Sequence, residues 1–148
     1  MSNSITLHRI LTSPQEKTFR AFSNTEAFCS WLPPYGFICI AHHREFRVGG
    51  SFKMSFLNFS TEKTQSFGGD FLEIMPNELI RYRDRFDDPT LTGEMLTTIK
   101  FSKVSCGTEL HIVQEGIPAM IPVEMCYLGW QESLEKLKKL VEPIIPDA

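Results

Sequence analysis

The chain has no long apolar run, no excess of basic residues and no closely spaced cysteines, and each absence excludes a class of protein. No stretch approaches the roughly 18 apolar residues of a membrane-spanning helix, so we expect no membrane association. A net charge of -3 gives no reason to expect nucleic-acid binding, which requires clustered Lys and Arg. The opening residues MSNSITLHRI lack a basic segment followed by an apolar core, so we expect no targeting peptide and a cytoplasmic protein.

Residues that could hold a metal ion or form disulfides are scattered along the chain. No C-x-x-C motif is present, and the wide spacing of the cysteines predicts free thiols in a reducing compartment. The cysteines are Cys29, Cys39, Cys106 and Cys126. His42 and His43 are adjacent, and adjacent residues of a strand point to opposite faces. His8 and His111 each stand alone in the sequence. We therefore predict neither a metal ion nor another cofactor.

One short basic stretch is present nevertheless. Arg81, Arg83 and Arg85 recur at period two, which sets them on one side of a strand. Such a stripe is typical of a solvated sheet face, and we interpret it so rather than as a nucleic-acid site.

The longest amphipathic segment is residues 122–142, PVEMCYLGWQESLEKLKKLVE. Its apolar residues recur at spacings of three and four and predict one buried helical stripe: Val123, Tyr127, Trp130, Leu134, Leu137 and Val141. A lone helix of this kind must pack on another apolar layer, and a β-sheet is the large partner that the rest of the chain offers.

The remainder of the chain predicts strands joined by short turns, preceded by two short helices. Ser13-Pro14-Gln15-Glu16 has the pattern of a capping box and predicts a helix start, and a second helix with Asn24 or Thr25 as its cap ends before Pro33-Pro34. Alternating residues predict strands near 4–12, from 37 onward, and near 52–56, 67–74, 79–86, 95–104 and 108–115. With 148 residues, the chain predicts a single domain, 1–148, of the α+β class.

Four stretches, in this order, resemble one family. They are residues 13–34 with Phe19 and Trp31, the turn Phe46-Arg47-Val48-Gly49-Gly50-Ser51-Phe52, the strand–turn–strand segment 71–80, and the helix opening Gly129-Trp130-Gln131-Glu132-Ser133-Leu134. Together they are similar to the START-like (SRPBCC) superfamily and, within it, to homologues of the heat-shock-protein-90 ATPase activator. The resemblance implies a helix-grip fold, in which a curved antiparallel sheet of six or seven strands wraps around the long C-terminal helix.

The resemblance also implies a general function. Superfamily members often enclose an apolar pocket between the last helix and the sheet and bind lipids, sterols or polyketides there, and some are enzymes. Many single-domain bacterial relatives have no assigned role.

Period two places several polar side chains on the same sheet face as the apolar ones. Tyr82, Asp84, Thr97 and Gln114 are therefore our candidates for orienting a ligand within an apolar pocket. A carboxylate among aromatic residues, such as Asp84, has a raised pKa and can act as a general base, or it can emerge into water at the end of the strand. The remaining predicted pocket residues are Trp31, Met54, Phe56, Ile99, Ile112, Cys126, Gly129 and Trp130.

Three functions remain open from the sequence. The first is a monomeric or homodimeric protein that binds a small, mostly apolar molecule in a pocket of a few hundred Å³. The second is a protein-interaction module with a chaperone as its partner. The third is a cyclase or hydrolase with Asp84 as base, which we place last because the chain contains no catalytic signature.

Overall fold

The computed structural model describes residues 3–147, and its helices and strands follow the predicted order. The elements are β1 (Ser4–Leu11), α1 (Gln15–Ser23), α2 (Thr25–Trp31), β2 (Phe37–Arg44), β3 (Ser51–Asn58), β4 (Thr64–Met75), β5 (Leu79–Phe86), β6 (Met95–Val104), β7 (Gly107–Glu115) and α3 (Val123–Val141).

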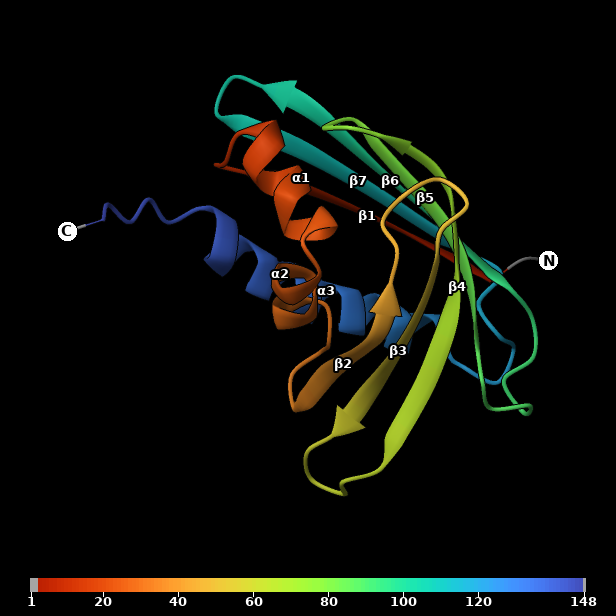
Figure 1. Cartoon of the computed structure of the whole chain (residues 1–148). Helices are drawn as coiled ribbons and strands as arrows, with labels where there is room; N and C mark the ends of the chain where they lie inside the picture. The colour runs from red at the N-terminus through yellow and green to blue at the C-terminus, as the bar shows by residue number, and fades with distance from the viewer. Residues whose placement is uncertain (1–2, 148) are drawn as a thin grey trace.

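The seven strands of the described chain form one antiparallel sheet in the order β1-β7-β6-β5-β4-β3-β2. The chain passes from one edge of the sheet to the other through α1 and α2, and then returns strand by strand through short turns and loops. Figure 1 shows that the sheet is strongly curved and that all three helices lie on its concave side. The predicted helix-grip fold is therefore confirmed, with seven strands.

The core fills the space between the concave face and the helices. Two of the residues that period two places on this face, Phe56 and Phe86, are half-buried. The others are buried: Phe52, Met54, Ile80, Tyr82, Met95, Thr97, Ile99, Phe101, Leu110 and Ile112. Alternation along the strands thus identifies correctly which face of the sheet is buried.

The long helix α3 buries most of the predicted stripe, but Tyr127 is 39% exposed, so its prediction as a stripe residue is wrong. The buried side of the helix is centred nearer to Trp130, Ser133 and Leu137. Ser133 belongs to it because its hydroxyl donates to the carbonyl oxygen of Leu32, at 2.5 Å. Tyr127 lies at the edge of this stripe and faces solvent.

The starts of the two short helices differ in how well the sequence predicts them. Asn24 caps α2, since its Oδ1 accepts from the backbone N–H of Ala27 at 2.9 Å. The capping box at Ser13 is wrong, because α1 begins without a side-chain cap and the hydroxyl of Ser13 is buried without a partner. Instead, the carbonyl of Ser13 accepts from the hydroxyl of Thr108 at 2.6 Å, so packing against β7 fixes this bend.

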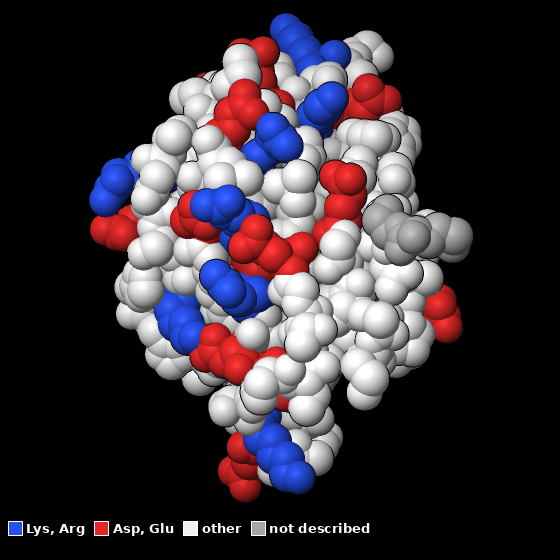
Figure 2. All heavy atoms as spheres, turned by 90° about the vertical axis from the view of Figure 1, so that its right-hand side faces the viewer, with Lys and Arg blue, Asp and Glu red and all other residues white. Residues whose placement is uncertain are grey.

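Charged residues of both signs are mixed on the outer side of the sheet, as Figure 2 shows for the face at the right of Figure 1. Arg83 Nε lies 2.8 Å from Asp70 Oδ1, and Arg81 pairs with Glu73 at 3.3 Å, both across the β4–β5 register. Carboxylates therefore accompany the arginine stripe on this solvated face, and exposed pairs of this kind add little stability.

Candidate functional site

A row of polar side chains crosses the buried face of the sheet. Tyr82 on β5 pairs with Thr97 on β6, and Thr97 pairs with Gln114 on β7, so the three side chains are neighbours on one face. Gln114 Nε2 donates to Thr97 Oγ1 at 3.2 Å, and Tyr82 lies beside Thr97 in the β5–β6 register. Burial raises the pKa of Tyr82, so its hydroxyl keeps its proton.

Helix α3 contributes one residue to this row. Trp130 Nε1 donates to Gln114 Oε1 at 3.1 Å, which fixes the indole against the sheet. The neighbouring Gly129 is half-buried, and a methyl group added to it would meet no atom within 4 Å. We name the connected set Tyr82, Thr97, Gln114 and Trp130 the polar row.

Asp84 lies next to the polar row but forms no bond with it. Its side chain is only 6% exposed, and its Oδ1 has no hydrogen-bond partner in the described chain. Burial raises the pKa of Asp84 to about 7, with a further contribution from the negative charge of Glu94. Near neutral pH the carboxyl is therefore partly protonated. The cross-strand partners of Asp84 are Gly69 on β4, which has no side chain, and the apolar Met95 on β6, so neither offers a hydrogen bond to its carboxyl.

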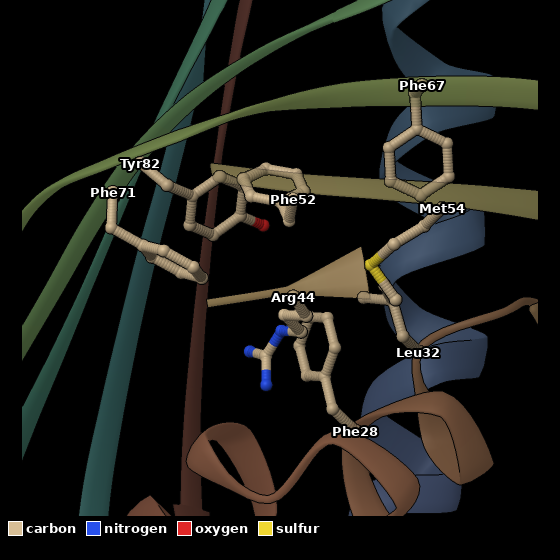
Figure 3. A pocket seen from close by; sticks show the side chains of 8 residues that line it. All are labelled: Phe28, Leu32, Arg44, Phe52, Met54, Phe67, Phe71 and Tyr82. Atoms are coloured by element: carbon tan, nitrogen blue, oxygen red, sulfur yellow. The ribbon is translucent and has the colours of Figure 1, made fainter. Parts of the chain in front are cut away.

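A small cavity of about 20 Å³ lies in front of these strands. Its lining comes from α2, the residue after α2, and strands β2 to β5: Phe28, Leu32, Arg44, Phe52, Met54, Phe67, Phe71 and Tyr82 (Figure 3). This volume holds roughly one water molecule. It is much smaller than the expected pocket of a few hundred Å³.

Tyr82 joins the cavity to the polar row, because it belongs to both. In the β4–β5 register, Phe67 and Phe71 line the cavity and Gly69 lies between them, directly opposite Asp84. Asp84 is therefore on the buried face at the margin of the cavity.

Arg44 is the charged residue of the cavity wall. Its guanidinium lies next to the Phe28 ring (Figure 3), 4.2 Å from the ring centre, and donates to the carbonyl of Phe22 at 2.6 Å. It also donates to the carbonyl of Ser23 at 3.3 Å, so its positive charge caps the C-terminal end of α1. Burial lowers the pKa of Arg44 to about 10, which leaves it charged at neutral pH.

The structure brings together part of the predicted set. Met54 and Tyr82 line the cavity, and Thr97, Gln114 and Trp130 form the rest of the polar row, with Asp84 beside it. The other predicted site residues lie outside the polar row and the cavity wall. Ile99 and Ile112 are in the core, Trp31 is buried between α1 and α2, and Phe56 is half-buried against Phe67. Cys126 is half-buried on α3, and Gly129 lies beside Trp130.

Trp31 is positioned as a packing residue. Its Nε1 donates to the carbonyl of Ala21 at 2.9 Å, and its ring packs edge-on against Phe22 and Phe28. Of the residues that line the cavity, the predicted set contains Met54 and Tyr82, and it misses the other six: Phe28, Leu32, Arg44, Phe52, Phe67 and Phe71. The β2–β3 register shifts between Ala41 and His43, and this bulge, which has no signature in the sequence, turns Arg44 inward.

Within residues 3–147, no helix is both long and apolar enough to cross a membrane. The same residues contain no group of three or more His, Cys, Asp or Glu side chains placed to bind a metal ion.

Comparison with known proteins agrees with the fold. The family described as "Activator of Hsp90 ATPase homolog 1-like protein" matches residues 12–142. Among curated proteins, none matches the chain significantly.

Similar solved structures come from bacteria. Protein CV1439 from Chromobacterium violaceum is 54% identical, with a TM-score of 0.95 over 96% of this chain and 99% of that chain. Protein NE0264 from Nitrosomonas europaea is 20% identical, with a TM-score of 0.78 over 93% and 92% of the two chains. A protein from Rhizobium leguminosarum is also 20% identical, with a TM-score of 0.78 over 94% and 93%. The last two show a shared fold alone.

Proposed function

We propose, from the premise that the chain belongs to the family of Activator of Hsp90 ATPase homolog 1-like proteins, that it binds a small, mostly apolar molecule between the helices and the concave face of the sheet. The cavity that would receive it is lined from α2 and from β2 to β5, and not from α3 as the sequence predicts. The observation that carries this proposal is the buried carboxyl of Asp84, whose Oδ1 has no partner in the described chain. Buried polar groups in folded proteins are almost always hydrogen-bonded, so an unpaired one at the margin of a cavity favours a missing partner.

The surroundings of Asp84 support an apolar ligand with one polar group. Phenylalanine rings and Met54 surround the cavity, while Tyr82 and Arg44 supply hydrogen-bond donors on its wall. Apolar pockets with a few placed polar groups are typical ligand sites. The ligand's hydroxyl or amine donates to Asp84, and its apolar part replaces water against the aromatic side chains.

A ligand larger than a water molecule requires the cavity to widen. Met54 separates Phe67 from Leu32 in Figure 3, and its unbranched thioether adopts alternative rotamers at low cost. Neither Met54 nor Phe67 belongs to the polar row, so rotation of these two side chains would widen the cavity without breaking a bond of that row.

A matched pair of probes tests the role of Asp84. We expect 2-naphthol to bind more tightly than 2-methylnaphthalene, by roughly tenfold, because the two have the same shape and only the first donates a hydrogen bond. Nuclear magnetic resonance follows binding through the two tryptophan indoles, one of which, Trp130, belongs to the polar row. The Asp84→Leu variant keeps the apolar volume and is expected to lose the preference for 2-naphthol.

Two results would count against this proposal. Equal binding of the two probes to the wild-type protein removes Asp84 as the polar anchor. Absence of any indole shift with either probe, up to their solubility limits, removes the ligand site itself.

A protein-interaction role is the second candidate, because apolar side chains are exposed at the start of α3. Met120, Met125 and Leu128 are 72%, 60% and 54% exposed, and such side chains serve as contacts at protein interfaces. The family description names an activator of Hsp90, so heat-shock protein 90 is the partner to test. If this candidate is correct, Met125→Asp with Leu128→Asp abolishes recovery of the chaperone in a pull-down. Failure of the wild-type protein to recover the chaperone contradicts it.

A further inference from the structure

Arg44 is a positive charge without a counter-ion in the wall of the cavity. The residue is half-buried, and every other residue of the lining is neutral (Figure 3). No ion pair within residues 3–147 includes Arg44. Charges that folding removes from water are normally paired with an opposite charge. An unbalanced cation beside a cavity therefore favours a negatively charged partner from outside the described chain.

The contacts that hold Arg44 leave much of its guanidinium free to donate. Two of its five N–H groups are used, Nη2 toward the carbonyl of Phe22 at 2.6 Å and Nη1 toward that of Ser23 at 3.3 Å. The other three, including that of Nε, have no acceptor among residues 3–147. The rings of Phe28 and Phe71 flank the group, with centres 4.2 and 5.5 Å from its central carbon. These neutral contacts fix the cation without cancelling its charge, which prepares it for a carboxylate.

The strand register connects Arg44 to Asp84. Arg44 lies opposite Phe52 of β3, Phe52 opposite Gly69 of β4, and Gly69 opposite Asp84 of β5. Neighbouring strands are about 4.8 Å apart, so three steps separate the two ends of this line by about 14 Å along the sheet. The two residues between them add one aromatic ring and no polar side chain. A molecule that lies along the line meets a cation at one end, apolar surface in the middle and the Asp84 carboxyl at the other end.

We propose that the ligand of this cavity is a carboxylic acid with an apolar body, whose carboxylate is bound by Arg44 and whose body lies over Phe52 toward Asp84. This inference rests on the proposed function and names the chemical class of its ligand. Tyr82 supplies a second donor to the carboxylate, because its side chain lines the same cavity. Aromatic acids and short fatty acids have the required form, and a hydroxyl group at the far end of either one donates to Asp84.

Two probes of the same shape isolate the effect of the negative charge. 2-Naphthoic acid is ionised at neutral pH, because carboxylic acids titrate at about pH 4, whereas 2-naphthamide is neutral and still offers a carbonyl oxygen. We expect the wild-type protein to bind the naphthoate about tenfold more tightly than the amide. Nuclear magnetic resonance follows both titrations through the indole of Trp31. That indole packs edge-on against Phe28, with 5.2 Å between ring centres, and Phe28 contacts the guanidinium of Arg44.

Three variants assign the preference to Arg44. Arg44→Met keeps an unbranched apolar side chain without the charge, and it is expected to bind the naphthoate and the amide equally. Arg44→Lys keeps a positive charge without the paired N–H groups, and it is expected to retain a reduced preference for the naphthoate. Arg85→Met is the matched control, because it removes an exposed arginine of β5, and it is expected to bind both probes as the wild type does.

The outcomes separate this inference from the proposed function. If the wild-type protein binds the neutral naphthalene probes but prefers the naphthoate no more than the amide, the acid-binding role of Arg44 is wrong and the apolar site stands. This comparison needs no variant, so it decides the matter even if Arg44→Met fails to fold. An unchanged preference in a folded Arg44→Met protein also overturns the inference. If no probe shifts either indole, the inference and the proposed function fail together.

Discussion

Replacement of Asp84 by Asn changes how the stability of the protein depends on pH. The pKa of Asp84 is raised from 3.8 to about 7, chiefly by burial. Between these values the folded protein holds a proton that the unfolded chain has released. The free energy of unfolding of the wild type therefore falls as pH rises through this window and levels off above pH 7. The amide of the Asp84→Asn variant does not titrate, so that protein lacks this contribution.

The magnitude follows from the size of the pKa difference. Roughly 3 pH units at about 1.4 kcal/mol each make ionisation of the buried carboxyl cost about 4 kcal/mol. Part of this loss of stability has already occurred at pH 5, because Asp84 of the unfolded chain ionises near pH 4 and is mostly charged at pH 5. Between pH 5 and pH 8 the wild type is thus expected to lose about 2–3 kcal/mol relative to Asp84→Asn.

The assay is urea unfolding of both proteins at pH 5, 6, 7 and 8, followed by tryptophan fluorescence. The titration of all groups that the two proteins share cancels when the free energy of unfolding of Asp84→Asn is subtracted from that of the wild type. The test therefore depends on how this difference changes with pH and not on its value at any one pH. Glu94→Gln is the matched control: it removes the second cause of the raised pKa and is expected to reduce the loss slightly. A difference between wild type and Asp84→Asn that is flat with pH, or that rises in favour of the wild type, would refute the reasoning.

Further predictions concern the helix, the sheet and the polar row. Gly129→Ala is expected to raise the free energy of unfolding by about 0.5–1 kcal/mol, because the added methyl group meets open space within a helix; a loss would show that the space is not open. Gly69→Ala is expected to destabilise, because its Cβ would collide with the carbonyl of Arg83, and urea unfolding compares the two alanine variants directly. Trp130→Phe leaves Gln114 Oε1 without its donor and is expected to cost about 1–3 kcal/mol; unchanged stability would mean that this bond contributes nothing.

The fold was predictable because its periodicities are simple. Alternation along β5, β6 and β7 placed Tyr82, Thr97 and Gln114 on the buried face, and the register brings them into one row. Apolar spacing placed Trp130 on the buried side of α3, where it reaches Gln114. Each of these predictions needs only the period of a regular element and the side on which its partner lies.

Features that depend on irregular geometry or on packing between elements were not predictable. The bulge that turns Arg44 inward has no sequence signature. Cavity volume depends on the rotamers of several large side chains at once, so period two cannot give it. The capping box at Ser13 failed because a contact with Thr108 outweighs a local motif.

The central claim, that the interior beside Asp84 binds a small apolar molecule, is tested most directly by native mass spectrometry of the protein purified gently from its own cells. The claim predicts a species heavier than the polypeptide by a constant mass of small-molecule size, which organic solvent releases and which Asp84→Leu retains less well. A spectrum that contains the polypeptide mass alone, in the wild type as in the variant, would contradict it.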